Sequence, residues 1–164
     1  MKHLWTPWRK KYMQGPKTHS GCIFCNALGM SDEEAMILHR GNGVFAIMNR
    51  YPYTNGHLMV VPYDHQPSLE HLKPEIRAEM MEVLSSAIMV LRKAYRPQGF
   101  NLGGNIGEAA GAGVADHVHL HVLPRWNGDT NFMTAIGETR VIPEEMCDTW
   151  QNLRALWTSE VHPK

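Results

Sequence analysis

The sequence predicts an α+β fold built on a five-stranded antiparallel sheet, with one long helix and one C-terminal helix. Three observations support this prediction: short apolar runs are separated by turn residues, two longer segments have helical periodicity, and residues 117–123 alternate strictly. Strands joined by short turns, with helices set apart along the chain, are typical of this class. A length of 164 residues suits a single domain. We divide it into an N-terminal arm (1–21), a core (22–135) and a C-terminal helical segment (136–164).

The composition excludes several classes of protein. Lysine and arginine (16) balance aspartate and glutamate (16), and this zero net charge argues against a general nucleic-acid or membrane-surface binder. No run approaches the roughly 20 apolar residues of a membrane span, and the N-terminus lacks the apolar core of a secretory signal. Three cysteines do not suggest a disulfide scaffold. The sequence therefore predicts a cytoplasmic enzyme or binding protein without a nucleic-acid or membrane partner.

The first half of the chain predicts three strands after an irregular arm. Apolar runs at 36–39 and 44–48 flank a Gly-Asn-Gly sequence at 41–43, which predicts a hairpin. A second turn cluster at 51–56 precedes a third strand at 57–61, which the following proline ends.

The second half predicts the two helices and a fourth strand. Pro74 is a favourable first helical residue, and apolar residues then recur at spacings of three and four for about five to six turns. Met81 and Met89 are expected to fill the core beside this stripe. A strand is expected at 100–102. Pro143 opens the second helix, in which Cys147 is expected to be a small core residue and the apolar face holds Met146, Trp150, Leu153 and Trp157.

The fifth predicted strand, residues 117–123, reads His-Val-His-Leu-His-Val-Leu. A period of two places His117, His119 and His121 on one face, each about 6.7 Å from the next. The aliphatic residues then fill the opposite face and anchor the strand to a core. Because burying three neighbouring imidazoles is costly unless each has a partner, we expect the row to face a cleft that holds a ligand.

A glycine-rich loop at 103–113 precedes the histidines, and five of its eleven residues are glycine. Such a loop can point backbone N–H groups at an anion. A neutral imidazole is a ready nucleophile towards phosphorus, and its neighbours can act as proton donors. Nucleotidyl chemistry is therefore favoured, while a catalytic metal bound by the histidines and a merely solvated sheet face remain alternatives.

Several segments resemble the histidine triad (HIT) family. Residues 117–125 are similar to the family signature, residues 49–62 to its central hairpin and residues 105–111 to its phosphate loop. Residues 4–9, 125–132 and 141–143 resemble the branch that cleaves diadenosine tetraphosphate. These segments are distributed over residues 4–157, and the resemblance implies a HIT-like fold and a homodimer in which two sheets join.

The resemblance also implies roles for individual residues. His119 is expected to attack the α-phosphorus of a nucleoside polyphosphate and form a nucleotidyl-histidine, so its ring should lie exposed and bind no metal. His121 is expected to contact the phosphate and assist the leaving group, while His117 supports the site. The expected nucleotide-binding residues are Phe45 at the base, Asn49 at the ribose, and Asn105, Gly111, Ala112 and Gly113 around the phosphates.

The expected function is cleavage of a dinucleoside polyphosphate, with diadenosine tetraphosphate as the preferred candidate, or of a related adenylylated compound, by a hydrolase or transferase. A phosphorylase that uses orthophosphate, and a nucleotide-binding signalling module with little turnover, are the alternatives. Ala112 and Gly113 stand where many relatives have Gln followed by Ser or Thr. This chain therefore lacks a side-chain hydrogen-bond donor to the phosphate there, and only backbone N–H donors remain. His121 stands where some phosphorylases have Gln, which favours water as the acceptor. No catalytic metal is required, although magnesium can accompany the substrate.

Cys22 and Cys25 form a Cys-x-x-Cys pair, which suits half of a tetrahedral zinc site but also a redox pair or two buried thiols. Spacing alone does not choose further ligands among His39, His57, His65, His71 and His117. The family resemblance implies that His65 and His117 complete a structural zinc site. For His57, a hydrogen-bonded core position and a role in the site are equally consistent with the sequence.

Overall fold

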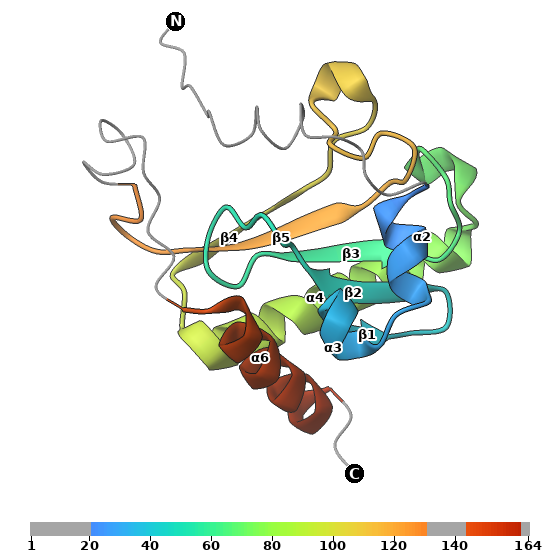
Figure 1. Ribbon diagram of the computed structural model, residues 1–164. Helices are drawn as coiled ribbons and strands as arrows, with labels where there is room; N and C mark the ends of the chain where they lie inside the picture. The colour runs from blue at the N-terminus through green and yellow to red at the C-terminus, as the bar shows by residue number, and fades with distance from the viewer. Residues whose placement is uncertain (1–20, 131–143, 162–164) are drawn as a thin grey trace, which may run out of the picture.

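The computed structural model describes residues 21–130 and 144–161, which form a five-stranded antiparallel sheet with helices against both faces (Figure 1). The predicted fold class is therefore confirmed. Residues 1–20 of the arm, all of 131–143 at the boundary of the predicted core and C-terminal segment, and 162–164 lie outside the described residues, so the division of the chain stays a prediction. None of the described helices has both the length and the apolar character needed to cross a membrane.

The strands lie in the order β1-β2-β3-β5-β4. Along the chain, the elements are α2 (Ile23–Leu28), α3 (Asp32–Ala35), β1 (Ile37–Arg40), β2 (Val44–Met48), β3 (Leu58–Pro62), the short 3₁₀ helix η1 (Leu69–His71), α4 (Pro74–Tyr95), β4 (Gly99–Gly103), the 3₁₀ helix η2 (Glu108–Ala110), β5 (Leu120–Arg125) and α6 (Met146–Glu160).

Alternate residues of the sheet pack into two separate apolar clusters. On one face, β2 and β3 pack with α4 and α6 through Val44, Ala46, Met48, Leu58 and Val60. On the other face, the same strands pack with α2 and α3 through Phe45, Ile47, Met59 and Val61. Both faces of β2 and β3 are thus covered, and these strands form the buried centre of the molecule.

The predicted helical faces are confirmed, with three exceptions. Met81 and Met89 of α4 are 53% and 44% exposed, so the expectation that they fill the core is wrong. Cys147 is also exposed and is not a core residue of α6. All three lie beside the buried stripe of their helix, where a shift of one position along the sequence moves a side chain by about 100° around the axis.

The fifth strand begins later than predicted. β5 starts at Leu120, so of the three histidines only His121 lies within it. The N–H of Val118 instead donates to the carbonyl oxygen of Gln66, at 2.7 Å. The predicted alternation of side chains nevertheless holds, because the aliphatic residues pack on the α4 side of the sheet, namely Val118, Leu120 and Val122.

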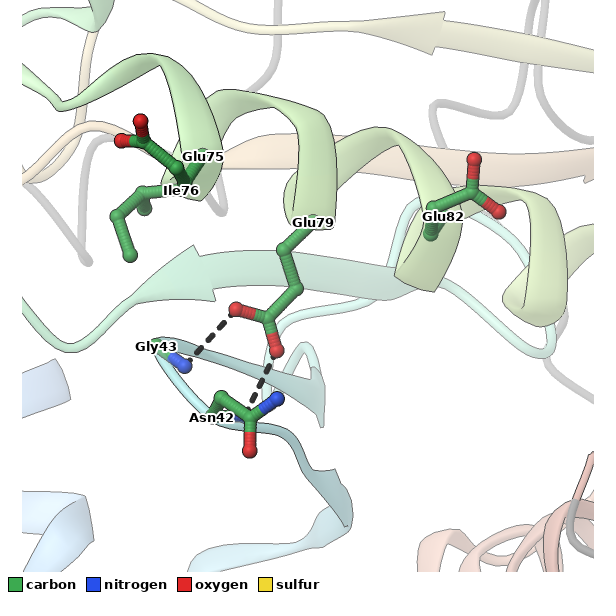
Figure 2. A pocket seen from close by; sticks show the side chains of 6 residues that line it. All are labelled: Asn42, Gly43, Glu75, Ile76, Glu79 and Glu82. Carbon is green, nitrogen blue, oxygen red and sulfur yellow. Dashed lines mark hydrogen bonds between the residues drawn. The ribbon is translucent and has the colours of Figure 1, made fainter.

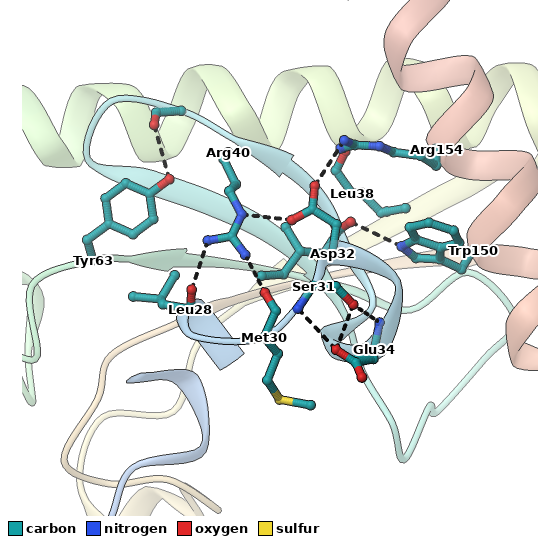
Figure 3. Close-up of polar contacts among 12 residues, drawn as sticks. Leu28, Met30, Ser31, Asp32, Glu34, Leu38, Arg40, Tyr63, Trp150 and Arg154 are labelled. Carbon is teal, nitrogen blue, oxygen red and sulfur yellow. Dashed lines mark hydrogen bonds and ion pairs between the residues drawn. The ribbon is translucent and has the colours of Figure 1, made fainter. Parts of the chain in front are cut away.

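The edge of the sheet at β1 is covered by side chains of α6 (Figure 3). Trp150 donates its indole N–H to the carbonyl oxygen of Ile37, at 3.0 Å. Arg154 donates to the carbonyl oxygen of Leu38 and forms an ion pair with Asp32, with 3.0 Å between Nη2 and Oδ2. These side chains occupy backbone acceptors that another strand could otherwise use.

The edge at β4 differs, because β4 has only β5 as a neighbour among the described strands. Three consecutive residues of this edge strand are exposed: Asn101, Leu102 and Gly103. The two edges of the sheet are thus unlike, because a helix covers one and no described strand or helix covers the other.

The β1–β2 turn is held against α4 by a carboxylate (Figure 2). Glu79 accepts hydrogen bonds from the backbone N–H groups of Asn42, at 2.7 Å, and Gly43, at 2.9 Å. A Cβ on Gly43 would lie 2.3 Å from the end of the Ile76 side chain, so glycine permits this close approach. A cavity of about 460 Å³ opens beside the turn, but none of the three triad histidines lines it.

Candidate active site and metal cluster

The imidazole row lies on the sheet face that α2 covers. The His119 ring sits between Phe24 of α2, with 4.8 Å between ring centroids, and His121, at 4.9 Å. On β3, Met59 lies directly opposite His121 in the antiparallel register. The predicted shared face of the histidines is therefore present, and α2, which the sequence analysis did not predict, forms one side of it.

The hydrogen bonding of His119 leaves one ring nitrogen available. Its Nδ1 lies 2.8 Å from the carbonyl oxygen of His117. Because a carbonyl only accepts, Nδ1 carries the proton and Nε2 carries the lone pair. Nε2 has no hydrogen-bond partner among the described residues. Burial lowers the pKa of His119 and outweighs the opposing effect of the His117 hydrogen bond, so the neutral, nucleophilic form is favoured.

The expectation that His119 lies exposed is not met, because its side chain is only 5% exposed. The ring packs against Phe24, which removes most of its surface from water. It is not, however, among the residues that could hold a metal ion.

His57 is the member of this site that the sequence analysis left undecided. It is 1% exposed, and its Nδ1 accepts the backbone N–H of Tyr53 at 3.1 Å. The ring proton therefore lies on Nε2, which is 2.8 Å from Nδ1 of His121. His57 thus donates to Nδ1 of His121. A neutral His121 ring therefore carries its own proton on the other nitrogen, Nε2 of His121. The sequence held only a weak signal for this pair, since His57 and the triad meet through pairing of distant strands.

The structure brings one of the two predicted nucleoside residues to this site. Asn49 follows β2, its backbone N–H donates to the carbonyl oxygen of His57 at 3.0 Å, and its side-chain oxygen accepts the N–H of Tyr51 at 2.9 Å. Phe45, in contrast, is completely buried and its ring stacks on Tyr63, with 5.6 Å between centroids. The expectation that Phe45 forms a wall of an open base site is therefore not met.

The glycine-rich loop uses part of its backbone for its own structure. The N–H of Gly111 donates to the carbonyl oxygen of Glu108, at 2.9 Å, and that of Ala112 to Gly107, at 3.4 Å. These two N–H groups are therefore not aimed at a phosphate, contrary to the expectation. Gly113 and the side chain of Asn105, in contrast, make no hydrogen bond with the described residues.

A second cluster lies at the other end of the histidine row. The potential ligand atoms of Cys22, Cys25, His65 and His117 all lie within 4.8 Å of one another. Sγ of Cys22 is 3.3 Å from Nδ1 of His117, and Sγ of Cys25 is 3.3 Å from Nδ1 of His65 and 3.7 Å from that of His117. Zinc bonds of 2.0–2.3 Å give tetrahedron edges of about 3.3–3.8 Å, so these separations fit a tetrahedral ion.

The hydrogen bonding of His117 also suits a metal ligand. Nε2 of His117 donates to the carbonyl oxygen of Pro62, at 2.9 Å, which leaves the lone pair of Nδ1 facing the cysteines. The four residues thus form a Cys₂His₂ donor set suited to zinc.

Comparison with known proteins decides the family. The model of the HIT domain matches residues 31–128. The chain belongs to the HIT family. A HIT relative from Mycobacterium tuberculosis, named AP-4-A phosphorylase, is 41% identical over 168 aligned residues, which cover 98% of this chain and 86% of the relative. The adenylylsulfatase HINT3 of Arabidopsis thaliana is 32% identical, over 66% of this chain and 54% of its own.

A solved structure of the same family also resembles this chain. A zinc-bound histidine triad family protein from Mycobacterium smegmatis aligns with a TM-score of 0.70 and 27% identity, covering 88% of this chain and 98% of its own. The HIT domain match begins at residue 31, after both cysteines of the cluster. His65 and His117 thus lie within the matched HIT domain, and the cysteines reach them from the segment that precedes it.

Proposed function

We propose that this HIT protein cleaves a dinucleoside polyphosphate, with diadenosine tetraphosphate as the preferred candidate, by nucleotidyl transfer through His119. The observation that carries the proposal is the arrangement of His119, whose Nδ1 donates to the His117 carbonyl while Nε2 keeps its lone pair. The M. tuberculosis relative, which matches nearly the whole chain, supports the choice of substrate through its name, AP-4-A phosphorylase.

The reaction follows from the two fixed rings. Nε2 of His119 attacks the α-phosphorus, a nitrogen–phosphorus bond forms, and the bond from phosphorus to the bridging oxygen breaks. The ATP leaves as an anion, and the charge that develops on its leaving oxygen accepts a hydrogen bond from the Nε2–H of His121, whose orientation His57 sets. The positive charge that develops on His119 is stabilised by its hydrogen bond to the His117 carbonyl. An acceptor oxygen then attacks the phosphorus, which breaks the nitrogen–phosphorus bond and releases the nucleotide.

We propose orthophosphate as the acceptor, since the name of the M. tuberculosis relative favours it over the water that His121 suggested. The test is to incubate the protein and diadenosine tetraphosphate with and without orthophosphate. Phosphorolysis yields ADP and ATP and requires orthophosphate, whereas hydrolysis yields AMP and ATP in either buffer. If the substrate binds but is not consumed, the protein is a binding module, and failure of binding would overturn the substrate assignment. Magnesium, where it takes part, accompanies the polyphosphate.

His57→Ala is expected to slow the leaving-group step. Without the donor at 2.8 Å, the His121 ring loses both its orientation and the group that fixes its tautomer. Loss of one well-placed hydrogen-bond donor to developing charge costs about 10²- to 10³-fold in kcat, so we expect kcat to fall by about 10²-fold. Comparing diadenosine tetraphosphate with an adenylylated substrate that has a weakly basic leaving group provides the measurement. The better leaving group should recover most of the lost rate, and equal losses on both substrates would contradict the role.

We further propose that Cys22, Cys25, His65 and His117 hold a structural zinc ion. The support is their tetrahedral separations and the zinc-bound M. smegmatis structure of the same family. When bound, the ion supplies a cross-link between the segment at α2 and the chain before β5. His117 would be both a ligand and, through its carbonyl oxygen, the residue that holds His119.

We also propose that two copies join through their open β4 edges. On the α4 side of this edge, Arg92 of α4 lies over the ring of Phe100 of β4, at 5.1 Å. Each of these two elements also carries an exposed apolar side chain, Met89 on α4 and Leu102 on β4. A second copy would cover both side chains and pair the free backbone groups. Sedimentation should show a dimer that Leu102→Glu combined with Met89→Glu converts to monomers, and a monomeric unaltered protein would refute this interface.

A further inference from the structure

One carboxylate outside the histidine row joins three separate elements. Oε2 of Glu144 accepts hydrogen bonds from Nδ2 of Asn55 at 3.0 Å, from the Tyr95 hydroxyl at 2.5 Å and from the Thr149 hydroxyl at 2.7 Å. Asn55 belongs to the turn before β3, Tyr95 ends α4, and Thr149 lies in the first turns of α6. Glu144 is therefore the point at which the turn before β3 is attached to both long helices.

The charge on Glu144 is maintained by these donors. Partial burial raises the pKa of its carboxyl, but hydrogen bonds from Tyr95, Asn55 and Thr149 together outweigh that effect and lower it. Burial and the bond to Glu144 in turn raise the pKa of Tyr95, so the hydroxyl keeps its proton. Hydrogen bonds to a charged acceptor are about twice as strong as neutral ones, so this contact holds the turn firmly.

The turn that Glu144 holds leads directly into the active site. The N–H of His57 donates to the carbonyl oxygen of Thr54, at 3.3 Å, across Asn55 and Gly56. Gly56 has a φ of +71°, and an added Cβ would lie only 2.9 Å from the side chain of Leu91 on α4. The turn is thus pressed against α4, and its position determines where the next residue, His57, places its ring.

We propose that Glu144 is a positioning residue for the reaction. By fixing Asn55 it holds His57 at hydrogen-bond distance from His121, and so directs the Nε2–H of His121 towards the leaving oxygen. The kinetic consequence rests on the proposed function, whereas the effect on the two rings does not. Glu144 touches neither ring and acts through the turn alone.

A double-mutant cycle with His57 tests the proposal. A displaced catalytic group costs up to about 10²-fold in rate, so Glu144→Ala is expected to lower kcat for diadenosine tetraphosphate cleavage by about 10- to 100-fold, with KM changed less than about threefold. In a His57→Ala background, the same change should alter kcat by less than about twofold. Glu144→Gln, which keeps an acceptor oxygen for the three donors, should recover most of the rate. If the alanine variant does not fold, the glutamine variant takes its place in the comparison.

A measurement without substrate separates this proposal from the proposed function. The ¹⁵N resonances of the His57 and His121 rings report the hydrogen bond between them, and Glu144→Ala is expected to shift both. Arg154→Ala is the matched control, because Arg154 attaches the same helix α6 to β1 and makes no contact with the turn. It should lower the melting temperature but leave kcat and the ring resonances unchanged. Unchanged rings in Glu144→Ala, or rate losses that multiply in the double mutant, would overturn the proposal.

Discussion

His119→Ala is expected to abolish nucleotidyl transfer, with turnover reduced by about 10⁴- to 10⁶-fold, as for other covalent nucleophiles. The reason is that Nε2 of His119 is the ring nitrogen of the triad that the structure leaves with a lone pair and no partner among the described residues. The measurement is to mix the protein with α-labelled diadenosine tetraphosphate, quench it and follow the label on the denatured chain. The unaltered protein should carry an acid-labile adenylyl group that the variant lacks.

Asp116→Ala is the matched control for this variant. Asp116 is exposed and lies three residues before His119, so the change should leave both the adduct and turnover intact. An adduct that persists in His119→Ala, or full turnover without any adduct, would contradict a covalent mechanism at this residue. The second result would instead indicate direct attack by the acceptor on the substrate.

Cys25→Ser is expected to have the largest effect on stability. The variant removes one of four ligands from a cluster that joins α2 to the chain before β5. Loss of a structural metal costs about 4 kcal/mol or more, and a domain of this size loses about 2–4 °C per kcal/mol. We therefore expect the melting temperature to fall by about 8–16 °C, measured by circular dichroism alongside the zinc content per chain.

Cys147→Ser supplies the comparison, because Cys147 is an exposed thiol on α6, outside the cluster. This change should leave one zinc per chain and the melting temperature unaltered. A chelator should lower the melting temperature of the unaltered protein to that of Cys25→Ser, and should have no further effect on the variant. Equal melting curves for all samples would show that the four side chains do not bind a structural ion.

The strands, the long helix and the C-terminal helix could be predicted because their patterns are local. The short helix α3 was missed, although its signal is present: Ser31 accepts the N–H of Glu34, and Glu34 accepts from the N–H of Ser31, as in a capping box. The start of β5 was placed too early because alternation continues through His117 and Val118, whereas the ladder with β3 begins only at Leu120. Periodicity records which face a side chain takes, not which neighbour its backbone pairs with.

In the candidate site too, some features follow from local sequence patterns and others depend on long-range packing. The shared face of the histidines follows from a period of two, and the metal ligands were expected from the family resemblance. The pairing of His57 with His121 depends on the register between β3 and β5, which short-range sequence patterns do not contain. The burial of Phe45 and the internal hydrogen bonds of Gly111 depend on packing that residue types alone do not fix.

The unlike edges of the sheet set a limit on assembly. A sheet with two open edges can add strands from further copies without end, which is the geometry of a fibre. Here Trp150 and Arg154 occupy two backbone acceptors of the β1 edge, so among the described strands the β4 edge is the one left to accept a partner strand. Once two copies have met there, neither retains a free edge among its described strands, and growth stops at a closed pair.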